Sequence, residues 1–220
     1  MAAASAQRSR DFPVVGVGAS AGGLEACKRL LGALPGGHGM ALILVLHLDP
    51  THESMMADLL APHTAMAVRQ AADGMPIEPN HLYIIPPGFY LSVDAGHLRL
   101  SAPDAPHGAR LPFDFLLKSL AAEYGANAIG VILSGTGADG SAGLKAMKGK
   151  GGFTVAQDPE EADYDGMPRS AIAAGAVDLV LPVEKIPEAL LAHGRQPADA
   201  PANTALAQIV DLLRASTAFD

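Results

Sequence analysis

The chain has 220 residues, 49% of them hydrophobic, with 24 glycines and 17 prolines, a composition typical of one compact α/β domain with many tight connections. Its formal net charge of −8 at pH 7 argues against nucleic acid or an anionic membrane surface as the main partner. The longest apolar run, residues 40–46, is far too short to span a bilayer, and the first ten residues lack the apolar segment of an export signal, so we expect a cytoplasmic protein with no membrane insertion.

Short β-like runs alternate with helical stretches along the chain. This alternation predicts a modified doubly wound α/β fold, with a mostly parallel sheet and helices on both faces. Strands are expected at residues 13–17, 41–46, 82–85, 129–133, 153–156 and 178–181, and helices at 22–34, 54–61, 113–124, 141–148, 168–174 and 186–192. Residues 90–93 and 97–100 are expected to form an inserted antiparallel hairpin around Asp94-Ala95-Gly96. The single cysteine, Cys27, lies on the apolar face of the first helix and is expected to be a core residue.

Three parts of the chain differ in composition. Residues 1–12 are expected to form a disordered tail, residues 13–193 the folded domain, and residues 194–220 a Pro/Ala-rich linker followed by an amphipathic helix. That last helix has an apolar stripe at helical spacing, formed by Leu206, Ile209, Val210 and Leu213. The stripe either docks back on its own domain or binds a partner or a second copy.

Ser20 lies in the glycine-rich segment Gly18-Ala19-Ser20-Ala21-Gly22-Gly23, between a predicted strand and a predicted helix. Glycines permit a sharp turn and a close approach of a ligand to the backbone, and the free amides at a helix start favour negative charge. Such a turn can present a nucleophile or hold a phosphate. A dinucleotide site is disfavoured because the glycine spacing is not Gly-x-Gly-x-x-Gly and no acidic residue ends a clear second strand.

Ser20, His47 and Asp139 each follow a predicted strand, and the carboxyl ends of parallel strands meet at one crevice. The three side chains can therefore meet as nucleophile, general base and orienting carboxylate. Each also has a plainer interpretation, with Ser20 as a helix cap, His47 as a polar group at the sheet edge and Asp139 as the N-cap of helix 141–148. The chain order Ser, His, Asp differs from the Ser, Asp, His order of α/β-hydrolases, so that fold is not expected.

A metal site is the alternative chemistry at the second strand end. His47, Asp49 and His52, with Glu53, have side chains that bind zinc or other divalent ions, and a metal-activated water hydrolyses esters without a serine. Against this, Pro50 breaks the segment into a loop, no second cluster of comparable density occurs, and residues 51–53 suit the start of the next helix. We therefore expect neither a metal nor another cofactor.

Five blocks of sequence keep their order over roughly residues 13–192. They are VGVGASAGG (15–23), VLHLDP (45–50), PNHLYIIPP (79–87), GVILSGTGADG (130–140) and DGMPRSAI (165–172). Together they resemble the chemotaxis protein-glutamate methylesterases of the CheB type. The resemblance implies a serine hydrolase whose active site lies at the carboxyl edge of a modified doubly wound sheet.

The resemblance implies that Ser20 is the nucleophile, His47 the base and Asp139 the orienting acid. It also implies that amides at Ala21 and near Thr136 bind the oxyanion. The implied reaction is hydrolysis of glutamyl methyl esters on the cytoplasmic domain of chemoreceptors to glutamate and methanol, with deamidation of receptor glutamine as a second activity. Arg110 and Asp114 match the family's Arg-x-Pro-x-Asp stretch and are implied to line the substrate groove. On residue type alone, Asp114 also suits a helix N-terminus and Arg110 a solvated loop.

The chain departs from the family pattern at Ala21, Thr136 and Ala138, where threonine, methionine and asparagine are frequent. These changes surround the reaction centre, so an inactive signalling scaffold is the alternative function. Regulated members carry a receiver domain before the esterase, whereas only about a dozen residues precede the first strand here. The Thr-Gly-Ala-Asp-Gly sequence and residues 49–54 are more similar to esterase modules fused to a methyltransferase. A methyltransferase or another signalling protein is therefore a further expected partner.

Overall fold

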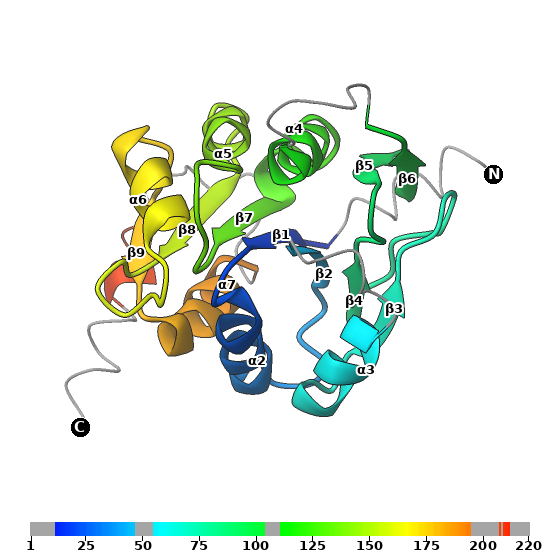
Figure 1. Ribbon diagram of the computed structural model, residues 1–220, viewed down its shortest axis with the longest axis horizontal. Helices are drawn as coiled ribbons and strands as arrows, with labels where there is room; N and C mark the ends of the chain where they lie inside the picture. The colour runs from blue at the N-terminus through cyan, green and yellow to red at the C-terminus, as the bar shows by residue number, and fades with distance from the viewer. Residues whose placement is uncertain (1–11, 47–54, 104–110, 195–206, 208, 212–220) are drawn as a thin grey trace.

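The computed structural model describes residues 12–46, 55–103, 111–194, 207 and 209–211. Seven strands form one sheet that is parallel throughout, in the order β3-β4-β2-β1-β7-β8-β9 (Figure 1). Its strands are β1 (Val14–Ala19), β2 (Ala41–Leu46), β3 (Ala67–Gln70), β4 (His81–Ile84), β7 (Ala128–Ile132), β8 (Phe153–Gln157) and β9 (Leu179–Leu181). A separate antiparallel pair joins β5 (Tyr90–Asp94) to β6 (His97–Ser101). The predicted fold class and the inserted hairpin are confirmed.

Helices cover both faces of the sheet (Figure 1). One face packs against α2 (Gly23–Ala33), α3 (Met56–Leu60) and α7 (Ile186–Gly194), and the other against α4 (Pro112–Tyr124), α5 (Ser141–Lys148), α6 (Gly166–Ala173) and the hairpin. Short 3₁₀ turns are η2 (Ala61–His63), η3 (Gly125–Asn127) and η4 (Val183–Lys185). Strands β1, β2, β7 and β8 are buried at every position, which is why they appear in the sequence as continuous apolar runs.

The two cores follow from the alternation of side chains along each strand. Val15 and Val17 of β1 belong to the core beneath α2, whereas Val14 belongs to the core beneath α4. Cys27 is buried on the inner side of α2, and burial raises the pKa of its thiol to about 12. The expectation that Cys27 is a core residue is confirmed.

The order of the strands creates a crevice at the carboxyl ends of β1 and β7. From β1 the chain passes to β2 on one side, and it later returns to place β7 on the other side of β1. The loops that leave β1 and β7 therefore run to opposite faces of the sheet and separate at this point. Such a topological switch point is where ligands bind in open α/β sheets.

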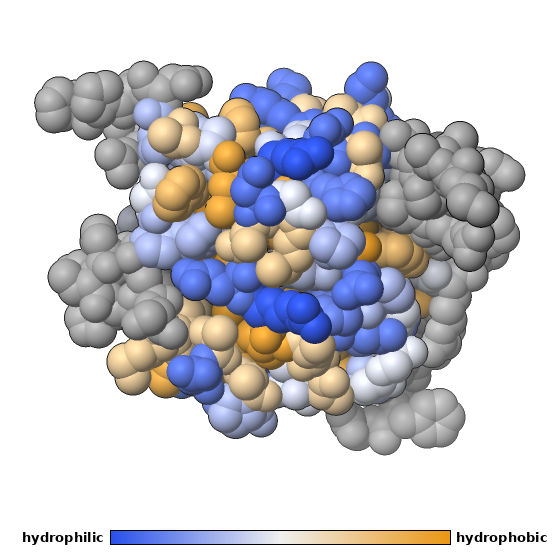
Figure 2. All heavy atoms as spheres, turned by 90° about the vertical axis from the view of Figure 1, so that its right-hand side faces the viewer, coloured by the Kyte–Doolittle hydropathy of each residue, from blue (hydrophilic) through white to orange (hydrophobic). Residues whose placement is uncertain are grey.

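Two regions differ from the sequence-based prediction or add to it. Edge strand β3 was not predicted, because its side chains are short or polar and mostly exposed. Figure 2 shows this end of the molecule, where hydrophilic side chains are interspersed with small apolar areas, as expected of an edge protected against further pairing. At the other end of the chain, Ile209 is only 1% exposed and packs in the core with α2 and α7. In the described part of the chain, no helix combines the length and apolarity needed to cross a bilayer.

Candidate active site

Ser20 directly follows the central strand β1. The turn that it begins ends two residues later at Gly22, the N-cap of α2. The turn is closed by a hydrogen bond of 2.8 Å from the Gly23 amide to the Ser20 carbonyl oxygen. Gly22 has a φ of 70°, a left-handed conformation that favours glycine, and a Cβ there would lie 2.7 Å from the Ser134 hydroxyl oxygen. The sequence therefore folds locally into a tight turn that leaves Ser20 half-buried at the strand end.

Ser134, the second residue after β7, holds this turn from the other side of the switch point. Its carbonyl oxygen accepts a hydrogen bond of 3.0 Å from the Ser20 amide. Its hydroxyl donates to the Ala21 carbonyl oxygen at 2.9 Å and accepts from the Tyr164 amide at 3.0 Å. Sequence reasoning missed this residue, although the rule that selected Ser20, a polar side chain directly after a strand, applies to Ser134 as well.

Gly135 brings the loop after β7 against Ser20. Its amide donates to the Tyr164 carbonyl oxygen and its own carbonyl oxygen accepts from the Met167 amide, both at 2.9 Å. A Cβ on Gly135 would lie 2.9 Å from the Ser20 Cβ and 2.2 Å from the Met167 Sδ. Only glycine fits this position, because any side chain would displace either Ser20 or Met167.

The amides expected to bind an oxyanion are those of Ala21 and of Thr136. Across the described residues, neither of these two amides donates to a backbone or side-chain acceptor. Thr136 and Gly137 are exposed, and Ala21 precedes the positively polarised N-terminus of α2. Both amides are therefore available to a negatively charged oxygen of a ligand beside Ser20.

Asp139 is only 4% exposed, and both of its carboxylate oxygens accept hydrogen bonds from the start of α4. Oδ2 accepts from the Phe113 amide at 3.0 Å and Oδ1 from the Asp114 amide at 2.9 Å. The N-cap of α5 is instead Gly140, with a φ of 96° and no capping side chain. The interpretation of Asp139 as the N-cap of helix 141–148 is therefore wrong, because its carboxylate caps the neighbouring helix.

Asp114 completes an exchange of caps between α4 and α5. It lies in the first turn of α4, is 4% exposed, and its Oδ1 accepts a hydrogen bond of 2.6 Å from the Gly143 amide in α5. Burial raises the pKa of the Asp114 carboxyl above its ordinary value, the Gly143 hydrogen bond opposes this rise, and the charge of Asp139 adds to it. The carboxylate of Asp114 thus faces α5, and a role for it in the substrate groove stays a prediction.

Four of the predicted site residues, His47, Asp49, His52 and Arg110, lie outside the described residues. His47 is the residue after Leu46, which pairs with Ala19 at the ends of β2 and β1. The structure therefore brings Ser20, Thr136 and Asp139 to one edge of the sheet, while the roles of His47 and Arg110 stay predictions. In the ranges that the structure describes, no group of three or more His, Cys, Asp or Glu side chains is arranged to hold a metal ion.

Comparison with known proteins gives matches over most of the chain. A sequence model described as CheB methylesterase matches residues 15–190. The crystal structure of the Thermotoga maritima CheB methylesterase catalytic domain superposes with a TM-score of 0.77 at 33% identity, covering 82% of this chain and 97% of that one. A protein-glutamate methylesterase/protein-glutamine glutaminase of Xanthomonas oryzae is 38% identical over 187 residues, which are 83% of this chain and 52% of that protein.

A longer relative matches only in part. An uncharacterized 104.1 kDa protein of Rhodobacter capsulatus is 45% identical over 131 residues, which are 60% of this chain and 14% of that protein. The chain thus spans about half the length of the Xanthomonas relative, and a much smaller share of the Rhodobacter one.

Proposed function

This chain belongs to the CheB methylesterase family, and from that premise we propose that it is a serine-dependent protein-glutamate methylesterase. The observation that carries the proposal is the position of Ser20 at the carboxyl end of β1, against Gly135 in the loop after β7, where neither the Ala21 amide nor the Thr136 amide donates to another described residue. A serine at a switch point with oxyanion donors at hand is the arrangement that acyl transfer requires.

In the proposed mechanism, the Ser20 Oγ attacks the ester carbonyl carbon while His47 takes the hydroxyl proton. The amides of Ala21 and Thr136 hold the oxyanion that forms, and His47 returns the proton to the departing methanol. Water then attacks the acyl-enzyme, giving the glutamate carboxylate and restoring the Ser20 hydroxyl. Asp139 orients His47 and stabilises its imidazolium form.

The proposed substrate is a methylated glutamate side chain on the cytoplasmic domain of a chemoreceptor. The Xanthomonas oryzae relative is named as a protein-glutamine glutaminase as well as a methylesterase, which supports deamidation of receptor glutamine as a second reaction at the same site. The two reactions differ only in whether methanol or ammonia leaves. Such substrates place the enzyme in the cytoplasm, where a methyltransferase that makes the ester is a natural further partner.

The test is methanol release from methylated chemoreceptor membranes. We expect release from the unaltered chain, in the presence or absence of a chelator, and loss of release from Ser20→Ala and from His47→Ala. Ser141→Ala is the matched control, because the buried Ser141 hydroxyl makes no hydrogen bond to any described residue and lies at the start of the neighbouring α5.

Each alternative function predicts a different result. Release that survives in Ser20→Ala but stops with the chelator would support the metal-dependent hydrolase at His47, Asp49 and His52. No release from the unaltered chain, together with no labelling of Ser20 by an organophosphonate, would support the inactive scaffold. Ammonia release from receptors that carry glutamine at the methylation sites tests the deamidase activity separately.

A further inference from the structure

Gln157, the last residue of β8, is a buried polar side chain directed at the loop that holds the nucleophile. It is 1% exposed, and its Oε1 accepts a hydrogen bond of 2.9 Å from the Ser134 amide. The carbonyl oxygen of the same residue, Ser134, accepts from the Ser20 amide at 3.0 Å. A single residue, Ser134, therefore connects the Gln157 side chain to the backbone of Ser20 by hydrogen bonds.

The side chain of Gln157 takes the place of a missing sheet hydrogen bond. The ladder between β7 and β8 ends with the pairing of Ile132 and Ala156. Beyond that pair the chain leaves β7 while β8 continues to Gln157, and the Ser134 amide meets the Gln157 side chain instead of a strand carbonyl oxygen. Removing the Gln157 amide group would leave a buried N–H without an acceptor, which favours movement of the whole loop.

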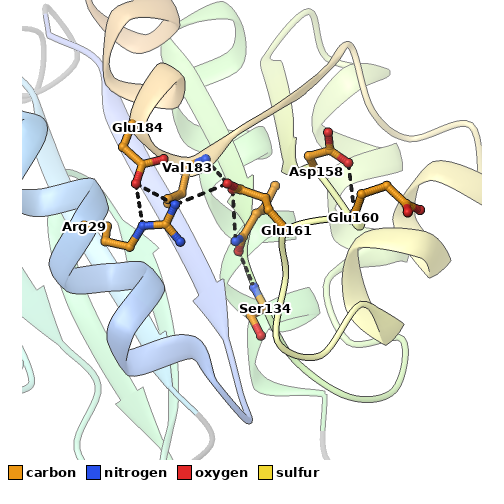
Figure 3. Close-up of polar contacts among 8 residues, drawn as sticks. Arg29, Ser134, Asp158, Glu160, Glu161, Val183 and Glu184 are labelled. Atoms are coloured by element: carbon orange, nitrogen blue, oxygen red, sulfur yellow. Dashed lines mark hydrogen bonds and ion pairs between the residues drawn. The ribbon is translucent and has the colours of Figure 1, made fainter.

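The other end of the Gln157 amide is fixed by Glu161, which Figure 3 shows between Arg29, Val183 and Ser134. Gln157 Nε2 donates to Glu161 Oε1 at 3.2 Å, and the same oxygen accepts from the Val183 amide at 2.5 Å. Arg29 of α2 donates to the second oxygen, Glu161 Oε2, at 3.2 Å and also to Glu184. The orientation of the glutamine amide is thus set by an acidic side chain that is itself held by three elements.

We propose that Gln157 is a positioning residue for the nucleophile, held in its orientation by Glu161. It fixes the backbone of Ser134 at its amide, and through that residue it sets where the Ser20 backbone and the Ser134 hydroxyl lie. The inference rests on the proposed function only in naming Ser20 as the nucleophile. Misplacement of a reacting group by about 1 Å lowers rates up to about a hundredfold, so the contribution is measurable.

The first variant is Gln157→Met, which keeps the length of the side chain and removes both hydrogen bonds. Its matched control is Thr154→Val, which removes a buried side-chain hydrogen bond of 2.8 Å to Asp178 from the same strand without touching Ser134. We expect Gln157→Met to lower the rate of Ser20 phosphonylation by a fluorophosphonate about 10- to 100-fold, and Thr154→Val to leave it unchanged. Methanol release should follow the same pattern in kcat, with KM unaltered.

A second pair of variants tests the role of Glu161. Gln157→Glu keeps an acceptor for Ser134 but sets a carboxylate against Glu161, so the rate should fall as in Gln157→Met. In Gln157→Glu combined with Glu161→Gln, the repulsion between two carboxylates is removed and the new amide at position 161 can donate to the carboxylate at position 157, although the Val183 amide loses its acceptor, so we expect a partial recovery of the rate. Recovery in the double variant is a result that a general loss of stability does not produce.

Amide hydrogen exchange supplies a readout that needs no activity. Gln157→Met should speed exchange at the Ser20 and Ser134 amides, whereas Thr154→Val should not. Unchanged exchange at both amides, or an equal fall in phosphonylation rate in Thr154→Val, would overturn the proposal. Phosphonylation of Ser20 without methanol release would contradict the proposed substrate and leave this inference standing, and in a chain that is not phosphonylated the exchange result alone decides.

Discussion

Ser20, the proposed nucleophile, and Asp139, the proposed orienting acid, are held in place by different means. Ser20 is held through residues from two other strands and a loop, because Ser134 follows β7, Gln157 ends β8 and Tyr164 lies in the loop after β8. Both carboxylate oxygens of Asp139 accept from the first turn of α4. The comparison shows that the Asp139 carboxylate is bound directly by the start of one neighbouring helix, whereas Ser20 is held through a chain of contacts from β7, β8 and the loop after β8.

Near the start of each of the helices α4 and α5, a carboxylate accepts hydrogen bonds from the start of the other helix. Asp139, just before α5, caps α4, and Asp114, in the first turn of α4, accepts from Gly143 of α5. Helices α4 and α5 can pack closely because Gly143 has no Cβ. A Cβ at this position would lie only 2.6 Å from the Leu117 Cβ. Four predictions, from the largest expected effect to the smallest, test how far the two sides differ.

Asp139→Ala should have the largest effect on stability. It removes two charge-assisted hydrogen bonds and leaves two buried amides at the α4 N-terminus without acceptors, at a cost of about 3 kcal/mol in the free energy of unfolding. Asp139→Asn keeps one acceptor oxygen and should lose about half as much. Urea unfolding of the three proteins measures both values. Equal stability of Asp139→Ala and the unaltered chain would show that the α4 cap contributes nothing.

Gly135→Ala should come next, and its main effect should be on the nucleophile. The added Cβ would lie 2.2 Å from the Met167 Sδ and 2.9 Å from the Ser20 Cβ. Overpacking of this kind costs about 1–3 kcal/mol, and we expect at least a tenfold loss of Ser20 phosphonylation. Gly149→Ala is the control, because Gly149 has a φ of −64° and the contacts of its added Cβ begin at 3.5 Å. That control should keep full reactivity.

Ser134→Ala should have a smaller effect on stability. It removes the hydroxyl that joins the Ala21 carbonyl oxygen to the Tyr164 amide, and loss of these bonds costs about 1–2 kcal/mol. The carbonyl oxygen that accepts from Ser20 remains, so Ser20 should still be phosphonylated, at a reduced rate. Thermal unfolding and the labelling rate together measure the effect. A loss of reactivity as large as that of Ser20→Ala would mean that the Ser134 hydroxyl has a role in the chemistry itself.

The smallest effect concerns pH and the acid side. Because the folded-state pKa of Asp114 is raised above its ordinary value, the folded protein binds this proton more readily than the unfolded chain. Stability from this group is present at low pH and is lost as pH rises from the ordinary pKa through the raised one. Asp114→Asn removes this dependence, so across that window its stability relative to the unaltered chain should improve as pH rises. Parallel urea midpoints for the two proteins would contradict the prediction.

Much of the frame of this site was predictable from the sequence. Strand ends are visible as apolar runs that stop at a polar residue, and this pattern located Ser20 and Asp139. The contact between Asp139 and the start of α4 could not be predicted in the same way, because α4 lies in a separate part of the chain, between the hairpin and β7. The partner of Asp139 is fixed by tertiary packing, and sequence spacing carries no signal for it.

The supporting residues of the nucleophile were missed for a related reason. Ser134 and Gln157 are single polar residues at the ends of apolar strands, and this pattern also suits an ordinary loop. Their roles come from the neighbours that the sheet order gives them, β7 beside β1 and β8 beside β7. Edge strand β3 was missed because it lacks the apolar run that a buried strand needs.

The contact between Ser134 and the nucleophile turn has a consequence for the synthesis of the protein. The Ser134 hydroxyl and the Ala21 carbonyl oxygen belong to residues 113 positions apart in the chain. While the ribosome is still making the middle of the domain, Ser20 has already emerged but has no loop to hold it. Long-range pairings of this kind form late in folding. We therefore expect the turn around Ser20 to take its final form only after the carboxyl-terminal half has joined the sheet.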